Sequence, residues 1–271
     1  MKQLIFSILF VTVLFSAFGQ QPSFSKKEPT KKDVKKKKIN ELIKHAEEGV
    51  LVYNKQSVFG VQGKTLGYGL FYELGKMKSN RKTATYRIDL TEIKSLKQDK
   101  FQSASTSFLF YGSPFIYGKV NNFYQLNMSY GQQKILGQKG NKNGVAVSAL
   151  YQGGLSLGCL KPYYLQVQDA VTNTPRYIKY SKADSSLFLG NRIMGAGGIG
   201  RGWNELTFKP GFIARTALRF DYGRYNEVVS GLEIGLTAEY FTNKITIMAA
   251  QDKDKSMFFQ AYIAMLFGRR K

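Results

Sequence analysis

Arginine and carboxylate side chains recur at even spacing along several segments of this chain. Arg87 and Asp89 are two residues apart, and Glu233 and Glu239 are six apart. In an extended chain, residues at even separations point to the same face. Guanidinium and carboxylate groups on one face can form bidentate ion pairs, or they can relay protons or act as acid and base. The full set is Glu73, Arg87, Asp89, Arg215, Arg219, Glu233 and Glu239.

Other groups that would turn this set into a catalytic site are missing from the same segments. The single histidine, His45, precedes all of them, and the single cysteine, Cys159, leaves no disulfide framework and no cysteine metal cluster. Hydrolysis of lipids or peptides commonly uses histidine as a general base. We therefore predict no catalytic residue, no cofactor and no metal. Our first interpretation of the charged set is a structural network, and a proton or ion path is the alternative.

One glycine-rich motif matches a nucleotide-binding pattern. Residues 195–200 read GAGGIG, which fits GxGxxG. That pattern binds a dinucleotide only between a strand and a helix of a parallel fold, whereas here Arg201, Gly202 and Trp203 follow and another strand is predicted. We interpret this motif as a flexible external loop that does not bind nucleotide.

Alternation of polar and apolar residues dominates the rest of the chain. It is clearest between residues 122 and 167, where two alternating runs flank the turn at 140–143 and indicate a hairpin. We predict eight such strands, at 56–65, 67–78, 83–97, 120–137, 144–167, 204–222, 227–250 and 255–268. Long connections at 98–119 and 168–203 alternate with short turns, as in a transmembrane barrel. Aromatic residues at 108–117 leave a ten-stranded barrel open.

The N-terminal region differs in composition. Residues 1–19 carry Lys2, an apolar core and small residues before Gln20, which predicts a signal peptide. Residues 20–49 are polar and basic; we expect a partly disordered periplasmic segment with a short helix over 34–48. Its lysines could bind a partner, and they are Lys35, Lys36, Lys37 and Lys38. Residues 50–271 then form the barrel.

The net charge is strongly positive. Forty Lys and Arg residues oppose eighteen Asp and Glu residues, a formal charge of +22. Export argues against nucleic acid, so anionic lipid head groups, lipopolysaccharide phosphates or an acidic envelope protein are the expected partners. Solvated turns that only keep the protein soluble are the alternative.

The last predicted strand carries a family resemblance. Its apolar parity comprises Met257, Phe259, Ala261, Ile263, Met265 and Phe267. This run resembles the C-terminal strand of Gram-negative outer-membrane proteins, which ends in an aromatic residue, although the tail from Gly268 to Lys271 departs from that pattern. Together with Gln20 at the mature end, the chain resembles small outer-membrane β-barrels of the OmpA/OmpX kind, of Bacteroidota type, over residues 50–268.

The fold class that we predict is all-β, an antiparallel transmembrane barrel in the outer membrane. Strands longer than 12 residues favour a membrane barrel over a soluble one. For function we predict a non-enzymatic structural or accessory component of a cell-envelope complex, such as a secretion or assembly complex. A narrow pore or transporter, a lipid-modifying enzyme and a soluble periplasmic lipid-binding barrel are the alternatives.

Overall fold

The computed structural model describes residues 53–102, 113–140, 144–169, 174–223, 227–249 and 255–271, which belong to one compact unit. The predicted signal peptide at 1–19 and the basic segment at 20–49, with its helix, His45 and the four lysines 35–38, lie outside these residues. No helix in the described part is long and apolar enough to cross a membrane.

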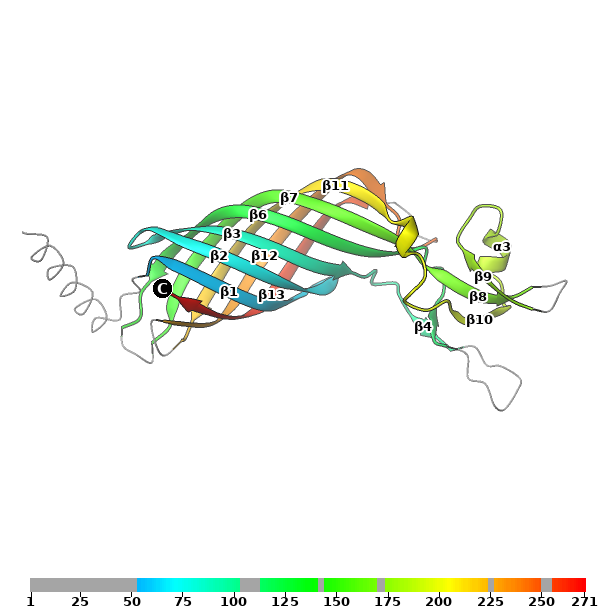
Figure 1. The fold of residues 1–271 in the computed structure, drawn as a ribbon, viewed down its shortest axis with the longest axis horizontal. Helices are drawn as coiled ribbons and strands as arrows, with labels where there is room; N and C mark the ends of the chain where they lie inside the picture. The colour runs from blue at the N-terminus through cyan, green and yellow to red at the C-terminus, as the bar shows by residue number, and fades with distance from the viewer. Residues whose placement is uncertain (1–52, 103–112, 141–143, 170–173, 224–226, 250–254) are drawn as a thin grey trace, which may run out of the picture. The chain divides into compact units, whose positions relative to one another are not determined.

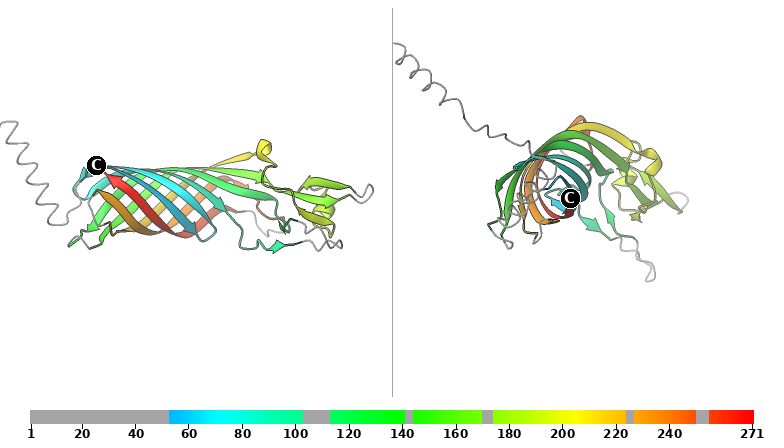
Figure 2. Two further views of the ribbon diagram at one scale, coloured as in Figure 1. Left: turned by 60° about the horizontal axis from the view of Figure 1, so that its bottom comes forward. Right: turned by 60° about the vertical axis from the view of Figure 1, so that its left-hand side comes forward.

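Eight antiparallel strands close into a barrel (Figures 1 and 2). They are β1 (Lys55–Lys64), β2 (Gly67–Ser79), β3 (Lys82–Ile93), β6 (Asn121–Gly137), β7 (Ala146–Pro162), β11 (Thr207–Asp221), β12 (Val228–Ile245) and β13 (Lys255–Arg270). Their order around the ring is β1-β13-β12-β11-β7-β6-β3-β2, and β2 pairs with β1 to close it. The predicted fold class is confirmed.

Several predicted strand boundaries were wrong. β3 ends at Ile93 instead of 97, and the predicted strand at 144–167 divides at Tyr163 into β7 and a separate strand, β8 (Tyr164–Gln168). The ten-stranded alternative also fails for the described residues. There, β4 (Lys100–Phe101) and β5 (Phe115–Ile116) pair with each other in a separate two-stranded sheet and add nothing to the barrel.

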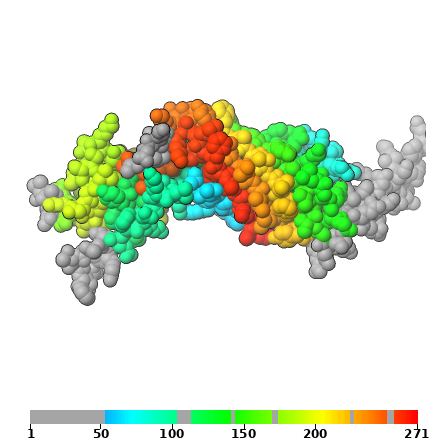
Figure 3. Space-filling view, turned by 180° about the vertical axis from the view of Figure 1, so that it is seen from behind, coloured from blue at the N-terminus to red at the C-terminus, as the bar shows by residue number. Residues whose placement is uncertain are grey.

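The barrel turns its apolar parity outward. On β3, Ile88 is 49% exposed and Leu90 is 60% exposed, while Arg87 and Asp89, which alternate with them, are buried. Side chains alternate across a strand, so one parity must face the lumen and the other the surroundings. An exterior of this kind is stable in lipid and not in water, which rules out the soluble lipid-binding barrel. Figure 3 shows one such outer face, where tilted bands of β11, β12 and β13 lie side by side.

An aromatic row marks the barrel end where the long connections emerge. Tyr68 of β2 pairs with Glu92, which pairs with Tyr124; Cys159 and Phe208 continue this outward-facing row around the ring. Aromatic side chains at such a level form the girdle by which membrane barrels sit at the lipid head groups. Cys159 is therefore a small outward-facing residue within this girdle.

The connection after β7 is folded. It contains β8, β9 (Pro175–Lys179), α3 (Ser185–Phe188), β10 (Ile193–Ala196) and η1 (Trp203–Glu205), and its strands form a sheet in the order β10-β8-β9. Its apolar core comprises Leu165, Val167, Ile178, Phe188 and Ile193, together with Phe115 of β5 from the connection after β3. The predicted external loop covers only the second part of the glycine motif: Gly195 and Ala196 lie in β10 and pair with β8, whereas residues 197–200 lie outside any strand.

The basic C-terminal tail continues the last strand. β13 runs to Arg270, whose guanidinium lies inside the barrel and pairs with Asp221 of β11. The Lys271 carbonyl accepts hydrogen bonds from the backbone N–H groups of Asn54 and Lys55, at 2.7 and 2.9 Å. The tail therefore belongs to the barrel closure between β13 and β1.

The outward orientation can be tested on β3. Replacing Ile88, near the middle of this strand, by Arg places a charge against the apolar phase and should lower the free energy of unfolding in vesicles by about 2–4 kcal/mol. Leu96→Arg is the control, because Leu96 is 80% exposed and lies beyond the end of β3. Urea titration checks both variants, and equal effects would contradict the assigned lipid-facing side.

Candidate functional site

The central layer of the lumen joins four strands through two arginines. Arg219 of β11 donates to Glu73 of β2 and to Glu233 of β12, each at 2.7 Å. Arg87 of β3 binds the second oxygen of Glu233, also at 2.7 Å. All four side chains are 0–1% exposed. Bidentate guanidinium contacts of this kind compensate the high cost of removing both charges from water.

Two of these ion pairs cross the full width of the barrel. In the ring order, β11 and β2 are four strands apart in either direction, and so are β12 and β3. The Arg219–Glu73 and Arg87–Glu233 pairs therefore join opposite walls. An eight-stranded barrel is just wide enough for side chains to fill it, and here charged side chains meet in its middle.

Asp89 extends this layer. One of its oxygens accepts from Arg87 Nε and the other from Arg215 Nη2, both at 2.9 Å. Two glutamines complete it: Gln62 accepts from Arg87 at 2.9 Å, and Gln152 accepts from Arg215 at 3.2 Å. The arginine donors in this layer thus meet neutral acceptors as well as carboxylates.

Two aromatic rings stack against the same arginines. The Arg87 guanidinium lies 3.4 Å from the centroid of the Phe71 ring, and the Tyr262 hydroxyl donates to Glu233 at 2.6 Å. Glycine makes the space for both rings, because a Cβ at Gly60 would come within 2.3 Å of Phe71 and one at Gly235 within 2.7 Å of Tyr262. The network therefore depends on glycines of neighbouring strands.

Glu239 lies in a separate layer nearer the long connections. It binds Lys64 at 2.8 Å, and it accepts from Gln125 at 2.9 Å and from Gln260 at 3.1 Å. The structure thus brings six of the seven residues of the predicted set together and places the seventh beside a different cation. All seven side chains are buried.

Different layers close the two ends of the lumen. At the end where the chain terminates, Asp221 pairs with Arg270 and with Lys139. At the opposite end, Phe123 of β6 packs against Phe241 of β12 and Phe258 of β13, with ring centroids 5.5 and 5.8 Å apart. The lumen is therefore closed by an ionic layer at one end and an aromatic layer at the other.

The chemistry available to this network is limited by its pairing. Glu73, Asp89, Glu233 and Glu239 each meet at least one cation within 3 Å. Charge-assisted hydrogen bonds of this kind hold each carboxylate in a fixed position inside the lumen. Among the described residues, no group of three or more His, Cys, Asp or Glu side chains could hold a metal ion.

Our reading of the sequence missed several lumenal residues. Lys64, Gln62 and Tyr262 share the inward parity of their strands, so the alternation itself could have found them. The aromatic layer was harder to find, because we assigned the inward parity to polar residues alone. Phe123, Phe241 and Phe258 overturn that rule at the end of the barrel.

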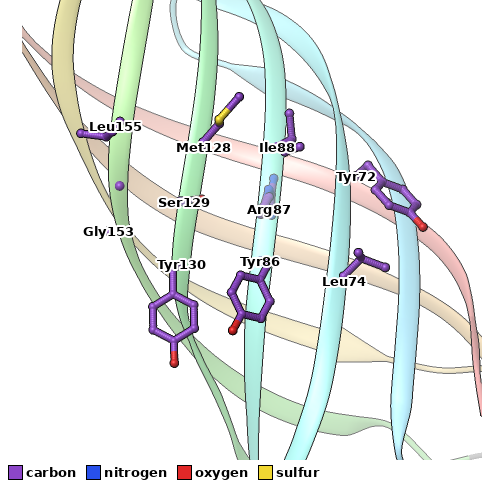
Figure 4. A pocket seen from close by; sticks show the side chains of 11 residues that line it. Tyr72, Leu74, Tyr86, Arg87, Ile88, Met128, Ser129, Tyr130, Gly153 and Leu155 are labelled. Atoms are coloured by element: carbon purple, nitrogen blue, oxygen red, sulfur yellow. The ribbon is translucent and has the colours of Figure 1, made fainter.

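One hollow of about 380 Å³ lies on the outer face of the barrel and is almost entirely apolar. Figure 4 shows Tyr86 and Tyr130 side by side on β3 and β6, with Gly153 on the adjacent strand. The ring centroids of Tyr86 and Tyr130 are 5.0 Å apart. Gly153 leaves a gap between larger outward side chains, and the almost entirely apolar surface of this hollow is what a lipid-facing wall presents.

Comparisons with known proteins give structural similarity only. No protein-family model matches the chain, and no curated protein matches it. Among solved structures, neisserial surface protein A aligns at 7% identity and a TM-score of 0.38, covering 80% of this chain and 96% of that one. The N-terminal barrel of Pseudomonas aeruginosa OprF aligns at 9% and 0.35, and the Yersinia pestis attachment invasion locus protein Ail at 9% and 0.34, each covering 80% of this chain and 99% of its own.

The class of protein follows from the barrel itself. A closed ring of eight tilted antiparallel strands, an apolar exterior with an aromatic girdle, and a polar lumen together define a small outer-membrane β-barrel. The protein therefore resides in the outer membrane.

The ionic layer can be tested with Arg219→Met. This change leaves Glu73 and Glu233 without one of their cations and should lower the free energy of unfolding by about 3–5 kcal/mol. The midpoint of the heat-induced mobility shift of the folded barrel on gels reports it. Arg269→Met is the control, because Arg269 is exposed on β13. Adding Glu73→Gln to Arg219→Met should recover part of the loss, and equal midpoints for the two arginine variants would contradict the network.

Proposed function

We propose that this protein is a non-enzymatic, non-conducting outer-membrane barrel that acts as a structural or accessory component of a cell-envelope complex. The observation that carries the proposal is the pair of ion bridges, Arg219–Glu73 and Arg87–Glu233, that join opposite walls of the lumen. In a barrel filled in this way, the interior stabilises the fold, and partners can bind only at its ends and on its outer face.

The pore alternative conflicts with the same geometry. A conducting lumen needs a continuous polar path, yet the ionic layer occupies the middle of the barrel and the Phe123, Phe241 and Phe258 rings occupy one end. Opening such a path would separate buried charges from their partners, at a cost of several kcal/mol for each ion.

The enzyme alternative lacks a base at the rim. His45 is the only histidine of the chain and precedes the barrel. The described acids of the lumen are paired with arginine or lysine, and they lie beneath a closed layer of rings. This arrangement supports a structural role for the charged set.

The folded connection after β7 supports a role in binding a partner. It builds a sheet of its own and supplies most of a core around Phe188, which is fully buried. Loops without a functional role do not need such a core, whereas a surface that must keep its shape for a partner does. With short turns at the periplasmic side, this sheet lies outside the cell. We assign it the external contact, and we assign the periplasmic contact to the basic segment at 20–49 with Lys35 to Lys38.

The closed lumen predicts an absence of conductance. In planar lipid bilayers, the purified protein should give no stepwise current at any moderate voltage, because its ion bridges and aromatic layer leave no aqueous path. A general porin, added to the same bilayer, is the positive control. Stable ohmic steps from the purified protein would overturn the non-conducting assignment.

The external sheet predicts a partner that can be lost independently of the barrel. Gly197 N–H donates to the Tyr164 carbonyl at 2.7 Å, so a short Gly-Ser linker can replace residues 165–196 without moving either end. The shortened protein should keep its heat-modifiable barrel. On native gels after mild detergent extraction, it should no longer migrate in the high-mass complex that we expect for the full-length protein.

Two point variants sharpen this test. Phe188→Ala removes the centre of the external core and should also release the partner, whereas Lys182→Gln changes only an exposed charge and should not. A native complex of unchanged mass after replacement of 165–196 would contradict an external contact.

A further inference from the structure

A basic hollow lies beside the aromatic girdle, at the end of the barrel that carries the external sheet. Its volume is about 520 Å³. It is lined by the ends of β2, β3, β6 and β7 and by the connections at 94–100, 114–119 and 196–199. Four lysines line it against one carboxylate: Lys94, Lys100, Lys119, Lys161 and Glu92.

Lys119 is the informative member of this group. It is 4% exposed, it lines the hollow, and no carboxylate in the described part of the chain lies within ion-pair distance of its ammonium. Its closest aromatic contact is the Tyr163 ring, at 5.5 Å. The single carboxylate, Glu92, already accepts a hydrogen bond from the Tyr68 hydroxyl at 2.6 Å. Buried charges are normally paired, and among the residues that the structure describes Lys119 has no carboxylate partner.

Two of the other lysines, Lys94 and Lys161, contact aromatic rings. The ammonium of Lys94 lies 4.6 Å from the centroid of the Tyr68 ring. That of Lys161 lies 4.4 Å from the Trp203 ring and donates to the Ile199 carbonyl at 2.5 Å. Cation–π contacts fix an ammonium in place and leave its charge available to a further anion.

The position of the hollow selects the kind of anion. Tyr68 and Tyr124 belong to the outward-facing aromatic row, and Lys94 and Lys161 lie one step further out along β3 and β7. Girdle aromatics sit at the level of the head groups, so lysines just beyond them face the phosphates of the membrane surface. Tyr164 and Ile199 of the external segment also line the hollow.

We propose that this hollow binds a phosphate group of a lipid head group in the outer leaflet, the phosphate ester of a lipopolysaccharide, with Lys94, Lys119 and Lys161 as its ligands. The ester supplies the anion that Lys119 lacks, and the lipid chains lie along the apolar face below the girdle. The proposal uses the orientation given above, with the external sheet outside the cell, and it does not depend on a protein partner.

The chain carries its own probe for this site. Trp203 is the only tryptophan, it stacks on Tyr124 with ring centroids 6.1 Å apart, and it contacts Lys161. A phosphate drawn to Lys161 changes the surroundings of this indole. Intrinsic fluorescence of the protein purified in alkyl maltoside micelles therefore reports occupancy during titration with lipid A.

Three titrants separate the sources of phosphate. Phosphorylated lipid A should change the Trp203 emission saturably, dephosphorylated lipid A should not, and inorganic phosphate should compete only weakly. Equal responses to the two lipids would overturn the phosphate assignment. Saturation by inorganic phosphate, with no stronger response to lipid A, would overturn the lipid source.

Single variants test the ligands. Lys119→Gln and Lys94→Gln should each weaken lipid A binding about tenfold, the loss expected for one charge-assisted hydrogen bond. Lys182→Gln, on the external segment but outside the hollow, should bind like the parent protein. The heat-modifiability gel verifies that each barrel is folded. Unchanged affinity in both pocket variants with folded barrels would overturn the site.

The same titration has a defined pH dependence. Burial, with smaller contributions from the charges of Lys94 and Lys161, lowers the pKa of Lys119 to about 8, and Glu92 opposes this shift. A phosphate monoester keeps its charge above pH 7, since its second pKa is about 6. Lipid A binding should therefore weaken between pH 7 and 9 as Lys119 loses its proton. In Lys119→Gln this decline should be smaller, and an equally steep decline would assign the titration to another group and contradict the role of Lys119.

Discussion

This structure depends on one constraint: the barrel places its apolar side chains outside, toward lipid, and its polar side chains inside the lumen. In lipid, every backbone hydrogen bond must be made within the protein, and a closed ring of strands achieves this. Closure directs every second side chain of each strand into a lumen that is too narrow for bulk water. The polar side chains there must therefore find partners within the protein. Ion pairs across the lumen meet this requirement, because each charge neutralises a partner from the opposite wall. They join Arg87 to Glu233 and Arg219 to Glu73.

The ion pairs also impose the register of the barrel. Because side chains alternate, shifting one strand by a single residue would turn its charged side chains toward lipid. Arg219 and Glu233 lie directly opposite each other in the β11–β12 pairing, and Arg87 and Glu73 do so in the β2–β3 pairing. A misaligned strand would expose one charged side chain to the bilayer. It would also leave the ion-pair partner of that side chain unpaired in the lumen. We infer that the network contributes to specificity as well as to stability.

The sequence predicted most of the barrel because period-two alternation is a local signal. It could not show which cation each acid meets, since Arg219 and Glu73 are far apart in the sequence and meet only when the ring closes. The ends of the barrel were harder still. Phe123 has the same parity as the lumenal polar residues, and only the stacking against Phe241 and Phe258 reveals an apolar layer there. The long connection after β7 has no strict period, so its sheet, which is stabilised by the core around Phe188, could not be predicted.

Charged side chains are paired differently at the two ends of the barrel. We infer that the pairs at one end stabilise the fold and that the lysines at the other end serve binding. Where the chain terminates, Asp221 is matched by Arg270 and Lys139, which completes the pairing inside the lumen. At the external end, the lumen closes with phenylalanine, and the lysines lie outside that closure, held by Tyr68, Tyr163 and Trp203. Charges that only stabilise a fold are paired with acids of the same chain. The lysines at the external end are fixed by rings and have no acid partner among the described residues, and this arrangement fits the proposed binding of a lipid phosphate of the outer leaflet.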